Sequence, residues 1–133
     1  MPTEVLHHPK ENMLETIYVG KVSPADVTAV AYKNLSLARK HKVHIFLADA
    51  SQLVDEKELM VENYDFANLL VKLFSRSFTK VRVGLVLPHD EIARGNLLFF
   101  ETVARNRFLN VHVVETRDDA LAWLFPIGDE QKD

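Results

Sequence analysis

The chain has 133 residues, the length of one domain that can bury its own core. Its composition, 47% hydrophobic and 26% charged, is ordinary for a globular protein. The net charge of −3 argues against non-specific nucleic-acid binding, which needs a basic face. The absence of cysteine excludes disulfides and thiolate chemistry. No apolar stretch is long enough to span a membrane and no secretory signal is recognised, so we expect a cytoplasmic protein.

The first half of the chain alternates strand and helix patterns. Residues 14–20 are rich in β-branched and aromatic side chains and end at a glycine, which predicts a strand. A helix follows, because Ser23 is a good N-cap, Pro24 suits the first helical position, and apolar residues then recur at helical spacing. A second strand is predicted over 43–48, and residues 4–8 are a candidate edge strand.

The second half continues the same alternation. A long helix is predicted from about residue 55 to 77, with acidic residues in its first turn and an apolar stripe. Residues 81–87 form the third strand, and a helix runs from about 90 to 107. The fourth strand covers 111–115, and the last helix follows it.

Four strand–helix units joined by short links predict an α/β fold with a mainly parallel sheet of four to five strands. We expect a single domain over residues 1–126 and a polar C-terminal tail over 127–133.

Alternation within the strands predicts how the sheet is covered. One set of alternate positions is uniformly apolar and consists of Ile17, Val19, Ile45, Leu47, Val83, Leu85, Leu87, Val111 and Val113. The other set is mixed and consists of Thr16, Tyr18, His44, Phe46, Arg82, Gly84, Val86, His112 and Val114. Because strands covered on both faces are almost continuously apolar, this split predicts helices mostly on one face.

Short segments in a fixed order suggest a family. They are Gly20 with Ser-Pro-Ala-Asp-Val at 23–27, the strand 43–48 followed by Asp-Ala-Ser, the strand 81–86 before Pro88, and 100–105 with 119–124. In their order and spacing the chain resembles the SpoIIAA-like family, the relatives of the sulfate-transporter and anti-sigma-factor-antagonist (STAS) domain. The resemblance covers residues 14–124 and implies four β-α units in a superhelix. It also implies a non-enzymatic regulatory module that acts through protein contacts.

The resemblance also bears on one loop. In anti-sigma-factor antagonists the motif Asp-Ser-Ser-Gly follows this strand, and a partner kinase phosphorylates its second serine. This chain has Asp49-Ala50-Ser51-Gln52, so Ser51 matches the modified position while Ala50 and Gln52 depart from the motif. The resemblance therefore implies a phosphorylation or interaction loop at Asp49 and Ser51, with Ser51 exposed at the start of a turn. The alternative is that both side chains brace a strand-to-helix turn.

Polar residues also follow the other predicted strands, where open parallel sheets bind ligands. Besides Asp49 and Ser51, this candidate ligand rim holds Lys21, His89, Asp90, Glu115 and Thr116. A histidine among carboxylates could act as a general base or hold a metal ion. Helix capping explains Asp90 and Thr116 equally well. The four glycines are too far apart for a phosphate-binding loop. No catalytic motif is found in the sequence, and we expect no catalytic residue, no metal and no cofactor.

Three functions stay open at this point. The leading hypothesis is a regulatory or protein-interaction module with a protein partner. The alternative is a carrier or sensor of a small apolar or anionic ligand, held between the long helix and the sheet. The third is a hydrolase at the candidate ligand rim, which requires His89 to reach Asp49 or Glu115. A cavity would favour the carrier, and a tightly packed core would favour the interaction module.

Two expectations concern surfaces and packing. Apolar residues on the mixed face, Tyr18 and Phe46, or a second stripe on the long helix, Met60 and Tyr64, predict the interface of a homodimer. Trp123 is expected to be the buried anchor of the last helix, with Leu121 or Leu124 beside it.

Overall fold

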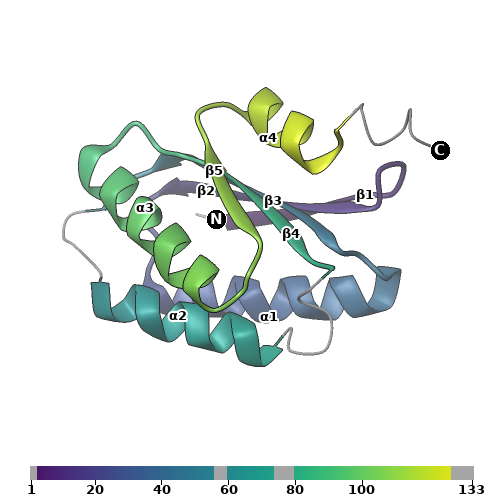
Figure 1. The fold of residues 1–133 in the computed structure, drawn as a ribbon, viewed down its shortest axis with the longest axis horizontal. Coiled ribbons are helices and arrows are strands. Elements are labelled where there is room, and N and C mark those ends of the chain that lie inside the picture. The colour runs from purple at the N-terminus through teal and green to yellow at the C-terminus, as the bar shows by residue number, and fades with distance from the viewer. Residues whose placement is uncertain (1–2, 56–59, 74–79, 127–133) are drawn as a thin grey trace.

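The computed structural model describes residues 3–55, 60–73 and 80–126 (Figure 1). The elements are β1 (Thr3–His8), β2 (Met13–Gly20), α1 (Pro24–His41), β3 (Ile45–Leu53), α2 (Met60–Leu73), β4 (Arg82–Val86), α3 (Glu91–Asn106), β5 (Val111–Val114) and α4 (Arg117–Leu124). The predicted tail at 127–133, and the predicted long helix over 56–59 and beyond residue 73, lie outside the described residues.

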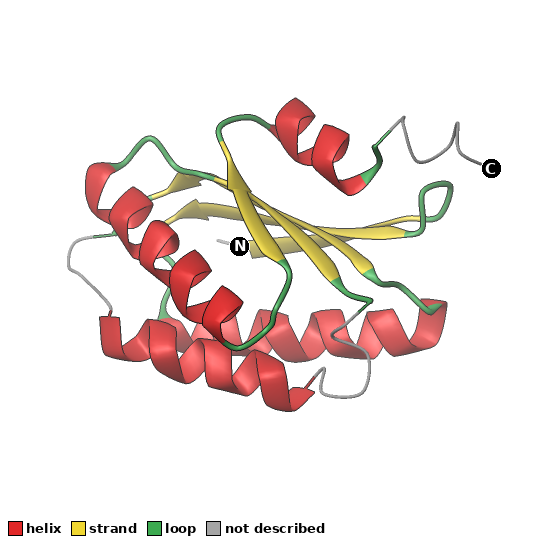
Figure 2. Ribbon diagram, in the orientation of Figure 1, coloured by secondary structure: helices red, strands yellow, loops and turns green. Residues whose placement is uncertain are grey.

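The strands form one five-stranded sheet in the order β1-β2-β3-β4-β5 (Figure 2). β1 pairs antiparallel with β2, and every other neighbouring pair is parallel. The predicted α/β class and the mainly parallel sheet are therefore confirmed, and the candidate strand at residues 4–8 is the antiparallel edge.

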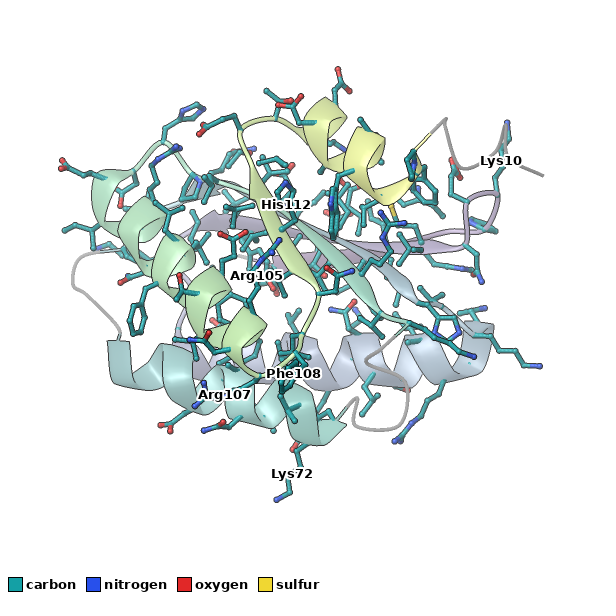
Figure 3. All side chains as sticks on the ribbon, in the orientation of Figure 1. Lys10, Lys72, Arg105, Arg107, Phe108 and His112 are labelled. Atoms are coloured by element: carbon teal, nitrogen blue, oxygen red, sulfur yellow. The ribbon has the colours of Figure 1, made fainter. Side chains whose placement is uncertain are left out.

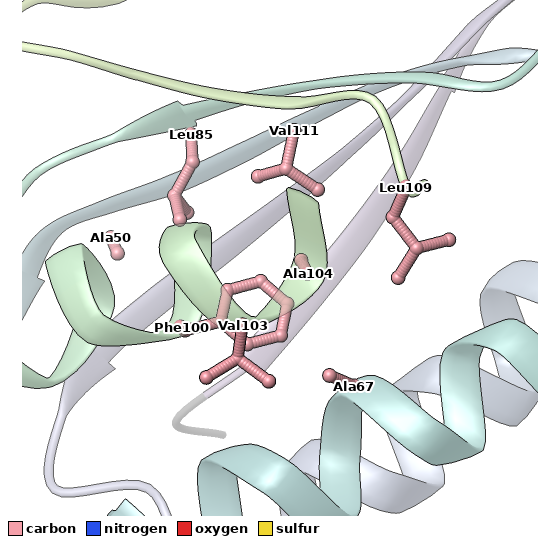
Figure 4. Packing of buried hydrophobic residues seen from close by; sticks show 8 residues of the cluster. All are labelled: Ala50, Ala67, Leu85, Phe100, Val103, Ala104, Leu109 and Val111. Carbon is pink, nitrogen blue, oxygen red and sulfur yellow. The ribbon is translucent and has the colours of Figure 1, made fainter. Parts of the chain in front are cut away.

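Among the elements that the structure describes, three helices cover one face of the sheet and one helix covers the other. α1 and α2 lie on the opposite side of the sheet from α4 (Figure 1). α3 joins α1 and α2, because Phe100 and Val103 pack with Ala67 of α2 and with Leu85 and Val111 of the sheet (Figure 4). The prediction that helices lie mostly on one face is confirmed.

The sequence analysis sorted the strand residues into two faces, and this sorting is wrong. In the structure, the residues of β2 and β3 from one predicted set share a face with the residues of β4 and β5 from the other set. The register pairs Phe46 with Val83, so both side chains lie on the face covered by α1, α2 and α3. Leu47 pairs with Gly84 and lies under α4. Phe46 is only 8% exposed, which rules out the interface predicted there. Alternation within one strand does not give its register against the next, which is why the prediction failed.

The helix caps agree with the sequence patterns. Ser23 forms a capping box with Asp26, and Pro24 is the first residue of α1. Asp90 accepts a hydrogen bond from the backbone N–H of Ala93 at 3.0 Å, and Thr116 accepts one from Asp119 at 3.1 Å. Capping therefore accounts for Asp90 and Thr116.

α4 docks on the sheet where β4 has no side chain. A Cβ atom added at Gly84 would lie 3.2 Å from Cδ1 of Leu124 and 3.3 Å from Cβ of Ala120. Leu124 is 1% exposed, whereas Trp123 is only half-buried. Cζ of the Arg82 guanidinium lies 4.8 Å from the centroid of the Trp123 ring. The Trp123 ring also stacks on the ring of His112. The prediction of Trp123 as the buried anchor is wrong, because Leu124 has that position.

Within the described ranges, no helix is both long and apolar enough to cross a membrane.

Candidate functional site

A pocket of about 430 Å³ lies between the sheet and the helices α1, α2 and α3. Its wall is mainly aliphatic and aromatic, with Phe46, Leu85 and Val111 from the strands and Val30, Leu70 and Phe100 from the helices. Figure 4 shows part of this region, where side chains from the sheet and from α3 point into the same interior. Small-molecule sites have this size and this mainly apolar lining.

A hydrogen-bonded polar pair is among the residues that line the pocket. Asn34 of α1 donates from Nδ2 to Oγ1 of Thr16 in β2 at 3.0 Å and to the backbone oxygen of Val30 at 3.0 Å. Oδ1 of Asn34 is buried and accepts no hydrogen bond from any described residue. Thr16 is itself only 4% exposed.

Tyr18 follows Thr16 on the same wall of the pocket. Burial raises the pKa of the Tyr18 phenol to about 12, so the phenol is neutral at physiological pH. The predicted interface at Tyr18 is therefore also wrong, since this side chain lines the pocket.

Two carboxylates also line the pocket. Asp55 accepts a hydrogen bond from Nδ2 of Asn96 at 3.0 Å, and its backbone N–H donates to Asp90 at 3.3 Å. Asp65 of α2 also lines this space. Among the described residues that line the pocket there is no lysine, arginine or histidine.

The predicted loop at Asp49 and Ser51 is part of a strand. β3 continues to Leu53, and Ser51 is half-buried within it. Both the backbone N–H and the hydroxyl of Ser51 donate to Oδ1 of Asp49, at 3.0 and 2.7 Å. The expected exposed turn is absent here, and the two side chains brace the strand where its register against β2 shifts.

The rest of the candidate ligand rim is brought together only in part, since, besides Arg94, His89 lies near enough to Glu115 to contribute to the lowered pKa of its carboxyl. Glu115 forms a bidentate ion pair with Arg94, which lowers the pKa of the Glu115 carboxyl. His89 and Lys21 are exposed, and no hydrogen bond links His89 to Glu115 or Asp49 within the described part of the chain. The described residues contain no cluster of three histidine or carboxylate side chains that could hold a metal ion.

The predicted interface on the long helix is not described in side-chain detail. Met60 and Tyr64 belong to α2, and their side chains lie outside the described part of the structure.

An ion pair between a buried carboxylate and an exposed arginine, on the α4 side of the sheet, escaped the sequence analysis. Glu15 of β2 is 4% exposed and accepts from Nε of Arg117 at 2.9 Å and from Nη2 at 3.0 Å. Nε2 of His8 lies 2.8 Å from Oε1 of Glu15. The hydrogen bonds from Arg117 lower the pKa of the Glu15 carboxyl. The sequence signal that could have revealed this ion pair is the acidic residue Glu15 inside the strand predicted over residues 14–20.

The polar pair in the pocket also escaped the sequence analysis as a site. Asn34 occupies a position on the apolar stripe of α1, between Ala31 and Leu35, both of which are buried. An amide on an otherwise apolar helix face was the signal that could have pointed to it.

The fold is that of a known structural class. The crystal structure, at 2.25 Å resolution, of an uncharacterized protein of the DUF3478 family from Shewanella loihica PV-4 has a SpoIIAA-like fold and is similar to this chain. The TM-score is 0.54 at 20% sequence identity, and the match covers 92% of this chain and 91% of that one. This chain therefore has a SpoIIAA-like fold. No family model and no curated protein matches the sequence.

Proposed function

We propose that this protein is a non-enzymatic STAS-like module that carries or senses a small apolar molecule. The ligand lies between the sheet and the helices α1, α2 and α3. The pocket of about 430 Å³ is the observation that carries this proposal. A regulatory module with a tightly packed core would have no such space, because protein interiors leave few voids larger than a water molecule.

The alternatives gain less support from the geometry. The phosphorylation switch depends on an exposed Ser51, and Ser51 is half-buried in β3 with its hydroxyl bound to Asp49. The hydrolase depends on His89 working with a rim carboxylate. Both oxygens of Glu115 instead bind Arg94, and Asp90 and Thr116 cap helices.

Filling the pocket tests the proposal. Ala48 lies in β3 and lines the pocket, so Ala48→Phe directs a ring toward the helices. We expect this variant to bind an apolar fluorescent dye such as aminoanthracene at least about tenfold more weakly, a change of roughly 1.4 kcal/mol. Its thermal stability should be unchanged or higher, because the ring enters unfilled space.

Ala122→Phe is the matched control, because Ala122 lies exposed on α4, away from the pocket. It should bind the dye as the parent protein does. A parent protein that binds no dye, and from which native mass spectrometry recovers no ligand, would contradict the proposal. So would an Ala48→Phe variant that loses about 1 to 3 kcal/mol, the usual effect of overpacking a filled core.

We further propose that the module self-associates through the part of the sheet that α4 leaves open. α4 packs on β3, β4 and β5. On β1 and β2 the same face carries Leu6 and Ile17, both half-buried, and Val19, which is 45% exposed. Apolar side chains gathered on an open face favour an interface.

Analytical ultracentrifugation tests this self-association. We expect a homodimer for the parent protein and a monomer for Ile17→Lys, since a charge on this face cannot be buried without a partner. Tyr32→Lys is the control, because Tyr32 is 52% exposed on α1, which covers the opposite face. A parent protein that sediments as a monomer at high concentration would rule the dimer out.

A further inference from the structure

The turn that ends α3 carries a phenylalanine where glycine is usual. The backbone N–H of Leu109 donates to the carbonyl oxygen of Ala104 at 3.0 Å, and the N–H of Phe108 donates to that of Arg105 at 3.0 Å. These are the two bonds of the Schellman motif, in which the residue at the position of Phe108 is left-handed and is most often glycine. Phe108 has a φ of 64°. A side chain in this conformation strains the backbone, so glycine would fit the turn better.

The Phe108 ring gains no burial in return for this strain. It is 82% exposed, the highest value among the exposed large hydrophobic residues of the described part of the chain. Lys42 ends α1 in the same left-handed conformation, but its side chain is charged and readily hydrated. Neither the backbone nor the core explains an apolar ring at position 108. The strained and exposed ring therefore favours a contact outside the chain.

Two cationic side chains lie close to this ring. Nε of Arg107 donates to Oδ1 of Asn68 at 2.6 Å, which holds the turn against α2. Lys72 lies one turn further along α2, on the same side of the helix as Asn68, and is exposed. Figure 3 shows Arg107, Phe108 and Lys72 in the region where the end of α3 meets α2.

The two ends of the parallel sheet differ in charge. Residues 42–44, 72, 80–81 and 105–110 lie toward the amino ends of β3, β4 and β5 and include no aspartate or glutamate. The cations of this basic end are Lys42, Lys72, Lys80, Arg105 and Arg107. Glu101 offsets one of them, at 3.7 Å from Nε of Arg105. At the carboxyl ends, residues 54–55, 87–91 and 115–119 hold six acidic side chains and one arginine, so the net charge of −3 coexists with a basic end around Phe108.

We propose that the basic end docks on lipid bilayers that contain anionic lipids, with the Phe108 ring inserted below the headgroups. A ring among cations suits this boundary, because the ring leaves water while the cations stay beside the lipid phosphates. The pocket extends to the same end, since Leu109 and Asn110 line it and Asn110 is exposed. Docking here brings the pocket next to a phase in which apolar molecules dissolve, which favours a bilayer over a nucleic acid. The inference adds a surface to the proposed function and does not depend on it.

Cosedimentation of the full chain with vesicles tests the docking. The probes are vesicles of phosphatidylcholine alone and vesicles of phosphatidylcholine mixed with phosphatidylserine. We expect binding to the anionic vesicles to be at least about tenfold tighter and to weaken as salt is added, because salt screens exposed charges. Equal binding to both kinds of vesicle, or binding to neither, would overturn the proposal.

Phe108→Gly separates a role at the surface from a role in folding. This variant should bind the anionic vesicles at least about tenfold more weakly, because the inserted ring is lost. It should melt at the same temperature as the parent protein or higher, because glycine adopts the left-handed turn without strain. Tyr32→Ala is the control, since Tyr32 is an exposed ring in the middle of α1, and it should bind as the parent does. A glycine variant that melts lower and binds vesicles normally would assign Phe108 to the fold and overturn its insertion.

Charge reversal tests the basic end. Lys72→Glu should weaken binding to the anionic vesicles several-fold. Lys21→Glu makes the same change just beyond the carboxyl end of β2, at the other end of the sheet, and should have little effect. Equal losses for the two variants would contradict docking through the basic end.

Two further outcomes distinguish the alternatives. A single-stranded oligonucleotide that binds more tightly than the vesicles, and loses this binding in Phe108→Gly, would identify a nucleic-acid surface and overturn the proposal. A parent protein that binds the apolar dye but no vesicles keeps the pocket function and rejects the docking. Binding to vesicles without binding of the dye supports the docking and rejects the pocket function.

Discussion

Leu124→Ala is expected to lower the free energy of unfolding by about 2 to 5 kcal/mol, the range for truncating a fully buried leucine. Leu124 is 1% exposed and packs in one cluster with Met13, Leu47 and Val86 of the sheet. Its side chain also lies over Gly84, so the alanine variant leaves a cavity directly above the backbone of β4. Urea unfolding followed by circular dichroism measures the loss.

Trp123→Ala is the comparison that decides which residue holds α4. Trp123 is half-buried, and its ring contacts are the guanidinium of Arg82 and the ring of His112. Contacts of this kind contribute about 0.5 to 1.5 kcal/mol each, so we expect a smaller loss than for Leu124→Ala. The opposite ranking would show that the indole ring, and not Leu124, attaches the last helix to the sheet. Because Trp123 is the sole tryptophan, its fluorescence in the Leu124 variant reports whether α4 stays docked.

Glu15→Gln is expected to destabilise the protein by about 1 to 3 kcal/mol, because it removes a buried carboxylate that accepts two hydrogen bonds from the Arg117 guanidinium. Arg117 holds both oxygens of Glu15, and His8 lies on one of them. Glutamine preserves the size of the side chain, so the loss reports the charge and its hydrogen bonds. Thermal unfolding at neutral pH measures it.

We expect the stabilising effect of the Glu15 carboxylate to depend on pH in the acid range. Arg117 lowers the pKa of Glu15 below its ordinary value of 4.5. A group with a lowered pKa in the folded state adds stability above its unfolded pKa and loses it as pH falls through the folded pKa. The stability difference between the parent and Glu15→Gln should therefore be complete at neutral pH and shrink below pH 4.5.

Glu115→Gln is the matched control for the size of the loss at neutral pH. The Glu115 side chain is 63% exposed in its ion pair with Arg94, and exposed ion pairs contribute little. If Glu15→Gln and Glu115→Gln lost equal amounts of stability, the prediction that the buried carboxylate of Glu15 contributes more than the exposed one would be contradicted. A difference that stays constant down to pH 3 would contradict its lowered pKa.

Much of the fold could be predicted because its signals are local. The serine and proline that begin α1, and the cap residues Asp90 and Thr116, need only their immediate neighbours in the chain. The end of β3 was missed for a related reason. Ala50 is buried and continues the strand, but Asp49 and Ser51 beside it have the composition of a turn.

The faces and the pocket could not be predicted in the same way. Whether Phe46 lies beneath three helices or one depends on the register between β3 and β4, which the alternation along one strand does not contain. The pocket depends on how far α1, α2 and α3 stand from the sheet. Side-chain volumes on several elements set that distance together. The hydrogen bond between Asn34 and Thr16 on the pocket wall likewise joins residues 18 positions apart, so local patterns do not reveal it.

The spatial order of the strands, which repeats their order along the chain, has a consequence for synthesis. As the polypeptide leaves the ribosome, each new strand finds its neighbour already present, and the sheet can grow at one edge without waiting for a later segment. α4 follows the last strand, β5. Until α4 has emerged, Met13, Leu47 and Val86 have no cover, so the nascent sheet exposes an apolar surface on this face.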